Sequence, residues 1–268
     1  MKLRTFLMAG LVTLSLVLPA SALTLSVDGR DRTAEAKTTA IQNTTYVSLR
    51  SVATMLDPTA QVDWKDGKAW VTTDKLTLTA RPGDEYIQVN GRYIYMANGV
   101  KAVNGSTMVA IRPFASAMGG KVDWVGQTST VLLTSGDGIP EEPTYDQEDL
   151  YWLSRIISAE SRGEPLLGKI AVGTVVLNRV ADSMFPDTIY GVIFDDRWGG
   201  QFEPVRNGTV YNEPTQESVM AAQLCLQGAR AAGDSLYFYA PHLTSNHWIH
   251  ENRTYVTTIG VHWFYRYN

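Results

Sequence analysis

The sequence LYWLSRIISAES at residues 150–161, followed by GKIAVGTVVLNRV at residues 168–180, decides the fold of the C-terminal half of the chain. In the first segment apolar residues recur at positions 150, 153, 156 and 157, which is the spacing of an amphipathic helix. Glu160 falls seven residues after Leu153 and four after Ile156. A helix of about 3.6 residues per turn therefore places the Glu160 carboxyl group on the buried stripe.

The second segment is apolar throughout residues 170–177 and predicts a buried helix. Its small residues Gly168, Ala171 and Gly173 would allow the helix that ends at Glu160 to approach closely. A carboxyl group between two packed helices loses hydration, which raises its pKa and suits a general acid near neutral pH. The alternative is a buried structural glutamate paired with an arginine, either Arg155 or Arg179.

The N-terminal half contains two similar segments at an offset of 62 residues. VDGR at 27–30 corresponds to VNGR at 89–92, and YVSLRSVA at 46–53 corresponds to MVAIRPFA at 108–115. VDW at 62–64 and VDW at 122–124 close the two copies, with the offset reduced to 60. Each copy predicts a strand and hairpin turn, a strand that runs into a short helix, and a V-D-W strand before another hairpin. We expect a small β-rich tandem-repeat domain over residues 23–135.

The ends of this domain are predicted from composition. Lys2 and Arg4 precede an apolar run over residues 6–18 and the small residues of 19–22, a pattern typical of a signal peptide over residues 1–22. The run is shorter than the roughly 20 residues that a bilayer requires, so we expect export and no membrane span after cleavage. Residues 136–149 contain two prolines, two glycines and six acidic residues. They predict a linker over 136–147 and a second domain over 148–268.

Composition excludes several function classes. A net charge of −4 and a sequence pI near 5.6 argue against nucleic acid as a partner. Cys225 is the only cysteine, so no internal disulfide can form, and its helical pattern favours a small apolar filler over a nucleophile. His242, His247 and His250 are not accompanied by carboxylates or thiolates at a metal-site spacing, so we predict no metal and no cofactor. We expect a monomer.

Residues 157–165, ISAESRGEP, together with residues 168–180 closely resemble the signature of the spore cortex-lytic (SleB/CwlJ-type) cell wall hydrolases. The similarity continues through FPDTIYGVI at 185–193, QFEPV at 201–205, LYFYAP at 236–241 and IGVHWFY at 259–265. Ala240 and Val261 stand where we expect asparagine, which affects local hydrogen bonding only. The N-terminal segment resembles the copper amine oxidase N-terminal-like domain. All four histidines lie outside it, so we expect a spacer or wall-binding element rather than a copper site.

The resemblance implies an α+β, lysozyme-like, mostly helical catalytic domain with small β elements, with peptidoglycan as substrate and Glu160 as catalytic acid and base. Glycosidases usually need two carboxylates. None of the other candidates has a comparably apolar setting: Glu164, expected to be solvated at a helix start, Asp187, the Asp195-Asp196 turn, expected to be exposed, and Glu203. A lytic transglycosylase that uses one glutamate therefore fits better than a muramidase.

Other functions and residues stay open at this point. The alternatives are a non-catalytic wall-binding protein or an N-acetylmuramoyl-L-alanine amidase, and the family implies either spore cortex lysis in germination or action on the vegetative wall. Aromatic and polar residues of the resembling blocks are candidates for substrate binding, although each aromatic residue could equally belong to the core. The candidates are Thr174, Gln201, Phe202, Tyr237, Tyr239, Trp248 and His262, and for Thr174 the alternative is a hydrogen bond to the preceding helical turn.

Overall fold

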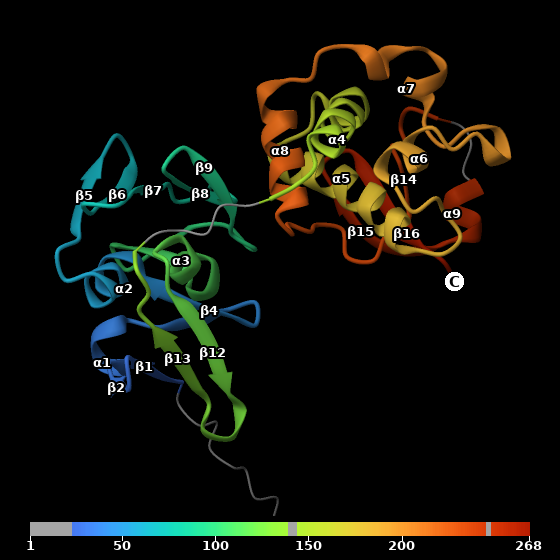
Figure 1. Cartoon of the computed structure of the whole chain (residues 1–268). Helices are drawn as coiled ribbons and strands as arrows, with labels where there is room; N and C mark the ends of the chain where they lie inside the picture. The colour runs from blue at the N-terminus through green and yellow to red at the C-terminus, as the bar shows by residue number, and fades with distance from the viewer. Residues whose placement is uncertain (1–22, 139–143, 245–247) are drawn as a thin grey trace, which may run out of the picture.

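The computed structural model describes residues 23–138, 144–244 and 248–268, so the predicted signal peptide lies outside the described residues. The described chain has a β-rich N-terminal part and a mainly helical C-terminal part (Figure 1). The overall class is therefore mixed α and β.

The N-terminal part is built from short strands and three short α-helices. The strands are β1 (Thr24–Val27), β2 (Arg30–Asp31), β3 (Thr39–Ile41), β4 (Thr44–Ser48), β5 (Gln61–Lys65), β6 (Lys68–Thr72), β7 (Thr77–Ala80), β8 (Tyr86–Val89), β9 (Arg92–Tyr95), β10 (Lys101–Val103), β11 (Ser106–Ala110), β12 (Lys121–Val125) and β13 (Thr130–Thr134). The helices are α1 (Thr33–Ala36), α2 (Leu49–Leu56), α3 (Ile111–Ala117) and the 3₁₀ turn η1 (Gly126–Thr128). The sheet orders are β12-β13-β1-β2, β10-β11-β4-β3 and β5-β6-β7-β8-β9.

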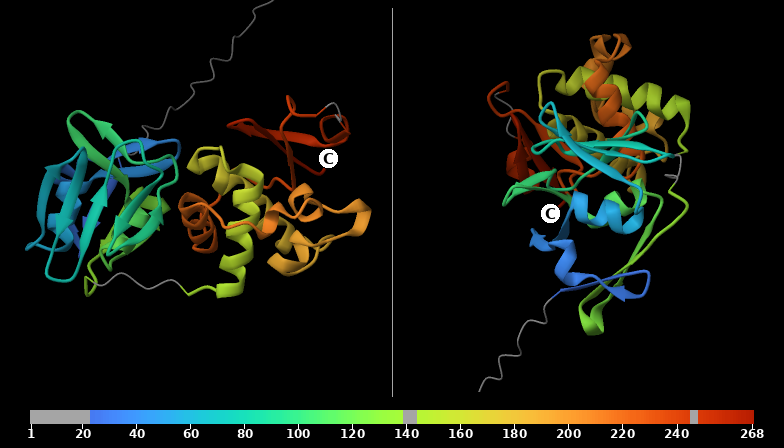
Figure 2. Two further views of the ribbon diagram at one scale, coloured as in Figure 1. Left: turned by 90° about the horizontal axis from the view of Figure 1, so that it is seen from above. Right: turned by 90° about the vertical axis from the view of Figure 1, so that its left-hand side faces the viewer.

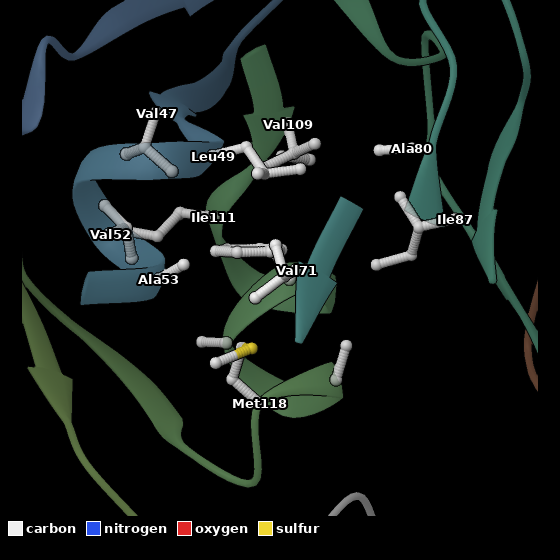
Figure 3. Close-up of a cluster of buried hydrophobic side chains, with 14 of the residues drawn as sticks. Val47, Leu49, Val52, Ala53, Val71, Ala80, Ile87, Val109, Ile111 and Met118 are labelled. Atoms are coloured by element: carbon white, nitrogen blue, oxygen red, sulfur yellow. The ribbon is translucent and has the colours of Figure 1, made fainter. Parts of the chain in front are cut away.

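The elements predicted for the N-terminal part are confirmed. Hairpin turns join β1 to β2 and β8 to β9, a strand runs directly into α2 and into α3, and each V-D-W strand, β5 or β12, pairs with the strand that follows it. Strand β1 pairs in parallel with β13, and β4 pairs with β11, so elements distant in sequence share two sheets. Their apolar faces form one core, part of which is drawn in Figure 3 with Val47, Val71, Ile87, Val109 and Met118.

The C-terminal part consists of helices and one small sheet. Its helices are α4 (Gln147–Ser161), α5 (Leu166–Ala181), α6 (Ile189–Ile193), η2 (Arg197–Gly199), α7 (Glu203–Arg206), η3 (Thr209–Tyr211), α8 (Gln216–Leu226) and α9 (Trp248–Asn252). Its strands are β14 (Tyr237–Tyr239), β15 (Thr254–Ile259) and β16 (His262–Arg266), in the order β14-β16-β15. Within the three described ranges, no helix is long and apolar enough to cross a membrane.

Helix α5 is the centre of the C-terminal part, with α4 and α8 packed against it on one side and the small sheet on another. The predicted close approach occurs at Gly173, where an added Cβ would lie 2.7 Å from Sγ of Cys225 and 2.9 Å from Cδ1 of Ile157. Cys225 is fully buried, and burial raises the pKa of its thiol to about 12. It is an inert apolar filler, as predicted.

The two parts touch through aromatic side chains. Tyr86, Tyr93 and Tyr95 of the β8–β9 hairpin pack against the core of the C-terminal part, and β9 lies against α8. The views in Figures 1 and 2 show this hairpin as the part of the N-terminal half nearest to α8. Strand β13 ends at Thr134 and α4 begins at Gln147, with Asp146 as its N-cap.

Candidate active site

Glu160 lies in the last turn of α4 with most of its side chain buried. Burial raises the pKa of its carboxyl group to about 7, with a smaller lowering effect from the charge of Arg179 and a smaller raising effect from Glu203. Among the described residues, the carboxyl group has no hydrogen-bond or ion-pair partner. The predicted shift of the pKa is therefore present, and the alternative of a glutamate paired with Arg155 or Arg179 does not hold.

Arg179, near the end of α5, places a buried positive charge close to Glu160. It is 4% exposed, and its Nε donates a hydrogen bond to the backbone oxygen of Leu236 at 2.8 Å. Its guanidinium carbon lies 5.0 Å from the ring centre of Phe202 and 5.8 Å from that of Tyr237. One terminal nitrogen, Nη1, has no partner in the described part of the chain. Because a guanidinium stays protonated in proteins, Arg179 is a fixed charge with unused donor capacity beside the acid.

A second arginine connects Tyr237 to Trp248. The guanidinium of Arg253 lies 4.8 Å from the Tyr237 ring centre and 4.6 Å from the Trp248 ring centre. Trp248 is 49% exposed and Tyr237 is half-buried. Tyr239 follows on the same face of β14, with its ring next to that of Trp263. These aromatic rings form a partly open wall that is linked to Glu160 through Arg179.

Three of the predicted substrate-binding residues are buried, which corrects those predictions. Thr174 is fully buried, and its hydroxyl donates to the Ile170 oxygen at 2.8 Å and accepts from the Ala231 nitrogen at 3.0 Å. The hydrogen bond to the preceding turn was the correct interpretation, and Thr174 also fixes the chain after α8. Phe202 is 3% exposed and supports the Arg179 guanidinium rather than offering a surface to a sugar.

His262 is also buried, at 7% exposure, so the prediction that it lines the cleft is wrong. Its ring packs edge-on against Phe238, and burial lowers the pKa of the imidazole. Its Nδ1 lies 4.0 Å from Oε2 of Glu164. It faces α5 because residues alternate along β16, which puts it on the inner face of the sheet.

The expectation that Glu164 is solvated is wrong too. The residue is 8% exposed, and its carboxylate accepts a hydrogen bond from the Val261 nitrogen at 3.0 Å. At Gly260, an added Cβ would come within 1.6 Å of that carboxylate. Glu164 therefore holds the β15–β16 turn.

The other carboxylates differ in their surroundings. Asp195 is buried and bonded through both oxygens to Arg197, contrary to the exposed turn predicted there. Glu203 is exposed, pairs with Arg206, and is the carboxylate whose charge reaches Glu160. Gln201 is half-buried and donates to the Arg197 oxygen at 3.4 Å, so its role in binding stays a prediction.

In the described ranges, no group of three or more histidine, cysteine or carboxylate side chains is arranged to hold a metal ion. His250 donates to or accepts from the Tyr265 hydroxyl at 3.0 Å, and His247 lies outside the described residues.

Reasoning from the sequence placed Glu160 on α4, where its catalytic role stays a prediction, and missed the positions of Arg179 and Arg253 beside the aromatic wall. The available signal was the charged Arg179 in an otherwise apolar helix, which was considered only as an ion-pair partner. Arg253 directly follows α9 and belongs to none of the blocks that resemble the family.

Comparison with known proteins gives two domain matches. Residues 163–265 match the cell wall hydrolase family, a match that begins three residues after Glu160, and residues 26–133 match the copper amine oxidase N-terminal domain. Together with the desolvated carboxyl group, the first match defines an enzyme of the cell wall hydrolase class.

The relatives are spore cortex-lytic enzymes. The chain is 30% identical over 204 residues to the spore cortex-lytic enzyme of Oceanobacillus iheyensis, covering 74% of this chain and 68% of that protein. It is 37% identical over 120 residues to a spore cortex-lytic enzyme of Bacillus cereus, covering 45% of each. The chain belongs to the spore cortex-lytic enzyme family. A solved structure, the catalytic domain of the germination-specific lytic transglycosylase SleB from Bacillus anthracis, is 35% identical, with a TM-score of 0.42 over 47% of this chain and 100% of that one.

Proposed function

We propose that the chain is a secreted lytic transglycosylase that cuts the bond between N-acetylmuramic acid and N-acetylglucosamine in peptidoglycan, with Glu160 as its acid and base. The observation that carries this proposal is the desolvated carboxyl group of Glu160, with a pKa of about 7 and no hydrogen-bond partner among the described residues. A group with this pKa is substantially protonated at neutral pH and can still act as a base after giving up its proton.

In the proposed reaction, the protonated Glu160 donates its proton to the glycosidic oxygen as the C1–O bond breaks. The resulting carboxylate then removes the proton from the C6 hydroxyl of the muramic acid, whose oxygen attacks C1. The product is a 1,6-anhydro sugar, no water is consumed, and Glu160 ends protonated as it began. The fixed charge of Arg179 stabilises the intermediate carboxylate, since an opposite charge favours the ionised form.

The surroundings of the other carboxylates favour one acid over two. Asp195 is neutralised by Arg197, and Glu164 is used inside the fold. Glu203 is exposed and paired with Arg206, so it is not held in the fixed orientation that a nucleophile needs. We assign binding of the glycan to the partly open wall of Tyr237 and Trp248, with Tyr239 and Gln201 next to it.

We also infer the remaining architecture. The C-terminal domain over residues 148–268 is grouped with the lysozyme-like folds, and residues 23–135 are a tandem duplication joined to it by a linker over 136–147. The recurrence of strand, helix and V-D-W hairpin supports the duplication.

The N-terminal domain attaches the enzyme to the wall through Trp64 and Trp124, which are 58% and 51% exposed. Family membership favours spore cortex as the wall that is cut, during germination.

Purified peptidoglycan digested by the full chain and by Glu160→Gln, with fragments analysed by mass spectrometry, tests the proposal. We expect anhydro-muropeptides from the wild type and a rate at least about 10³-fold lower for the variant, because it retains the shape but not the proton. New reducing ends would identify a muramidase, and free peptides an amidase. Binding without release of fragments by either protein would identify a wall-binding protein.

A further inference from the structure

A cavity of about 350 Å³ lies beside α4, outside the proposed catalytic site. Its lining includes Arg155 and Ser158 of α4, the C-cap residue Arg162, and the amide residues Asn207 and Asn212. It contains two guanidinium groups and no acidic residue, although the chain as a whole carries a net charge of −4. A cavity with this lining attracts an anion.

The polar groups of the lining are arranged to donate hydrogen bonds. Arg155 is 8% exposed, its guanidinium lies 3.7 Å from the Tyr151 ring centre, and its Nε has no partner in the described part of the chain. Ser158 already accepts a hydrogen bond from the Thr215 nitrogen at 3.2 Å, which leaves its hydroxyl hydrogen to donate. The Asn207 oxygen accepts from Thr209, which leaves its amide hydrogens to donate.

One residue of the protein, Glu213, already accepts hydrogen bonds from both arginines of this cavity. Glu213 accepts from Nη2 of Arg155 at 2.7 Å, and its backbone oxygen accepts from Arg162 at 3.0 Å. The Glu213 side chain is 86% exposed and is not part of the cavity lining. Because the Glu213 carboxylate is solvated and only Arg155 is buried, an incoming carboxylate can take its place at the Arg155 guanidinium.

The cavity and Glu160 lie at the same end of α4. Ala159, the residue before Glu160, lines it, and so does Asn207, the C-cap of α7, the helix whose Glu203 raises the pKa of Glu160. Four helical residues span about 6 Å, and three extended residues span about 10 Å. A peptide attached to a sugar at the catalytic site can therefore reach the cavity.

We propose that this cavity binds an oxyanion of the cell wall, namely a free carboxylate of the peptide stem carried by the glycan strand. The inference rests on the proposed function, since that function brings peptidoglycan to Glu160. Arg155 and Arg162 hold the carboxylate, and the two asparagine amides and the Ser158 hydroxyl complete its hydrogen bonds. The phosphate of a wall polymer has the same chemistry and is the competing source.

Calorimetric titration of the full chain carrying Glu160→Gln, which binds without cutting, tests this proposal. The probes are a disaccharide–tetrapeptide with free carboxylates, the same fragment with its carboxylates amidated, and inorganic phosphate. We expect at least about tenfold tighter binding of the free form than of the amidated form. Adding Arg162→Gln should remove most of this preference, and adding Glu213→Gln should tighten binding of the free form about threefold. Both substituted side chains are on the surface, so the fold is retained.

Arg32→Gln removes a comparable surface arginine, paired with Glu35, and should change nothing. Equal affinity for the two fragments, or a preference that survives Arg162→Gln, would overturn the proposal. Phosphate bound through Arg162, without a preference between the fragments, would show that the stem is the wrong source. Cleavage of peptide-free glycan separates this result from the proposed function: Arg162→Gln should cut it at the wild-type rate, whereas failure of the wild type to cut it would refute the catalytic proposal alone.

Discussion

The protonation of Glu160 depends on its burial and on two charged groups that act at a distance. Burial raises the pKa of its carboxyl to about 7, the charge of Arg179 opposes this shift, and Glu203 adds to it. Because no hydrogen bond fixes the carboxyl among the described residues, it is free to bond to the glycosidic oxygen of a substrate. The surroundings of Glu160 therefore favour a role in proton transfer over a role in stabilising the fold.

The pH dependence of cleavage follows from this pKa. The first step requires the protonated acid, so we expect kcat/KM on purified peptidoglycan to fall above pH of about 7, roughly tenfold for each further pH unit. Values of kcat/KM measured across this pH range at constant ionic strength would show the decrease, which is the alkaline limb of the pH profile. A rate that stays constant far above pH 7 would mean that Glu160 is not the acid.

Arg179→Gln provides the control that links the limb to Glu160. Removing the positive charge removes the influence that lowers the pKa of Glu160, so the limb should move to higher pH, whereas Arg179→Lys should leave it near its original place. If Arg179 only supported the fold, both variants would lose activity without moving the limb.

The same carboxyl group should reduce the stability of the protein at alkaline pH. Its pKa in the folded state, about 7, lies above the ordinary value of 4.5, so the folded state binds the proton more tightly. Stability from this group is full below pH 4.5 and is lost as the pH rises through 7. Glu160→Gln does not ionise and should raise the free energy of unfolding by up to about 3 kcal/mol at pH 8, with no gain at pH 4.

Urea unfolding of the wild type and Glu160→Gln at the two pH values measures this difference. Glu251→Gln changes an exposed glutamate of α9 and should have the same free energy of unfolding as the wild type at each pH. A variant that is destabilised at pH 8 would show that the buried carboxylate is stabilised by a favourable interaction.

At the level of elements, the position of Glu160 depends on the close packing of α4, α5 and α8. Gly173 has no room for a methyl group, whose carbon would lie 2.7 Å from Sγ of Cys225 and 2.9 Å from Cδ1 of Ile157. We expect Gly173→Ala to cost about 1–3 kcal/mol in the free energy of unfolding, since overpacking a buried contact forces the helices apart. Gly163→Ala is the matched control, because an added Cβ there meets no atom within 4 Å. Equal losses for both variants in chemical unfolding would contradict this account.

Helices and strands could be predicted where the spacing of apolar residues shows which face of the element is buried. The stripe through Leu153 and Ile156 located α4 and placed Glu160 on it, and the repeated hairpin signals located the strands around Gly29 and Gly91. The spacing of apolar residues within one element does not show which distant parts of the chain pack against its side chains. Thr174 and His262 were wrongly assigned for this reason, since the chain after α8 and the Glu164 carboxylate, both distant in sequence, already occupy their surroundings.

At the scale of the whole molecule, the two domains are expected to act on the same wall. Strands β5 and β12 carry the repeated V-D-W sequences. Because side chains alternate along a strand, each tryptophan lies on the same face as the valine two positions before it, and that valine packs in or against the core. Trp64 and Trp124 nevertheless remain 58% and 51% exposed, so their indole rings are accessible to a partner. The flat face of a sugar ring suits an exposed indole.

The last prediction is that these two tryptophans hold the enzyme on insoluble peptidoglycan. In the Glu160→Gln background, we expect Trp64→Ala and Trp124→Ala each to weaken co-sedimentation with the wall about 3- to 10-fold, and the double variant to weaken it further, because two linked sites act together. Substitution by phenylalanine should restore part of the binding, since an aromatic face remains. Leu132→Ala, at an exposed site on the neighbouring strand β13, should bind normally. Undiminished binding by the double alanine variant would leave the N-terminal domain as a spacer, because its only large exposed aromatic faces among the described residues would then contribute nothing to attachment.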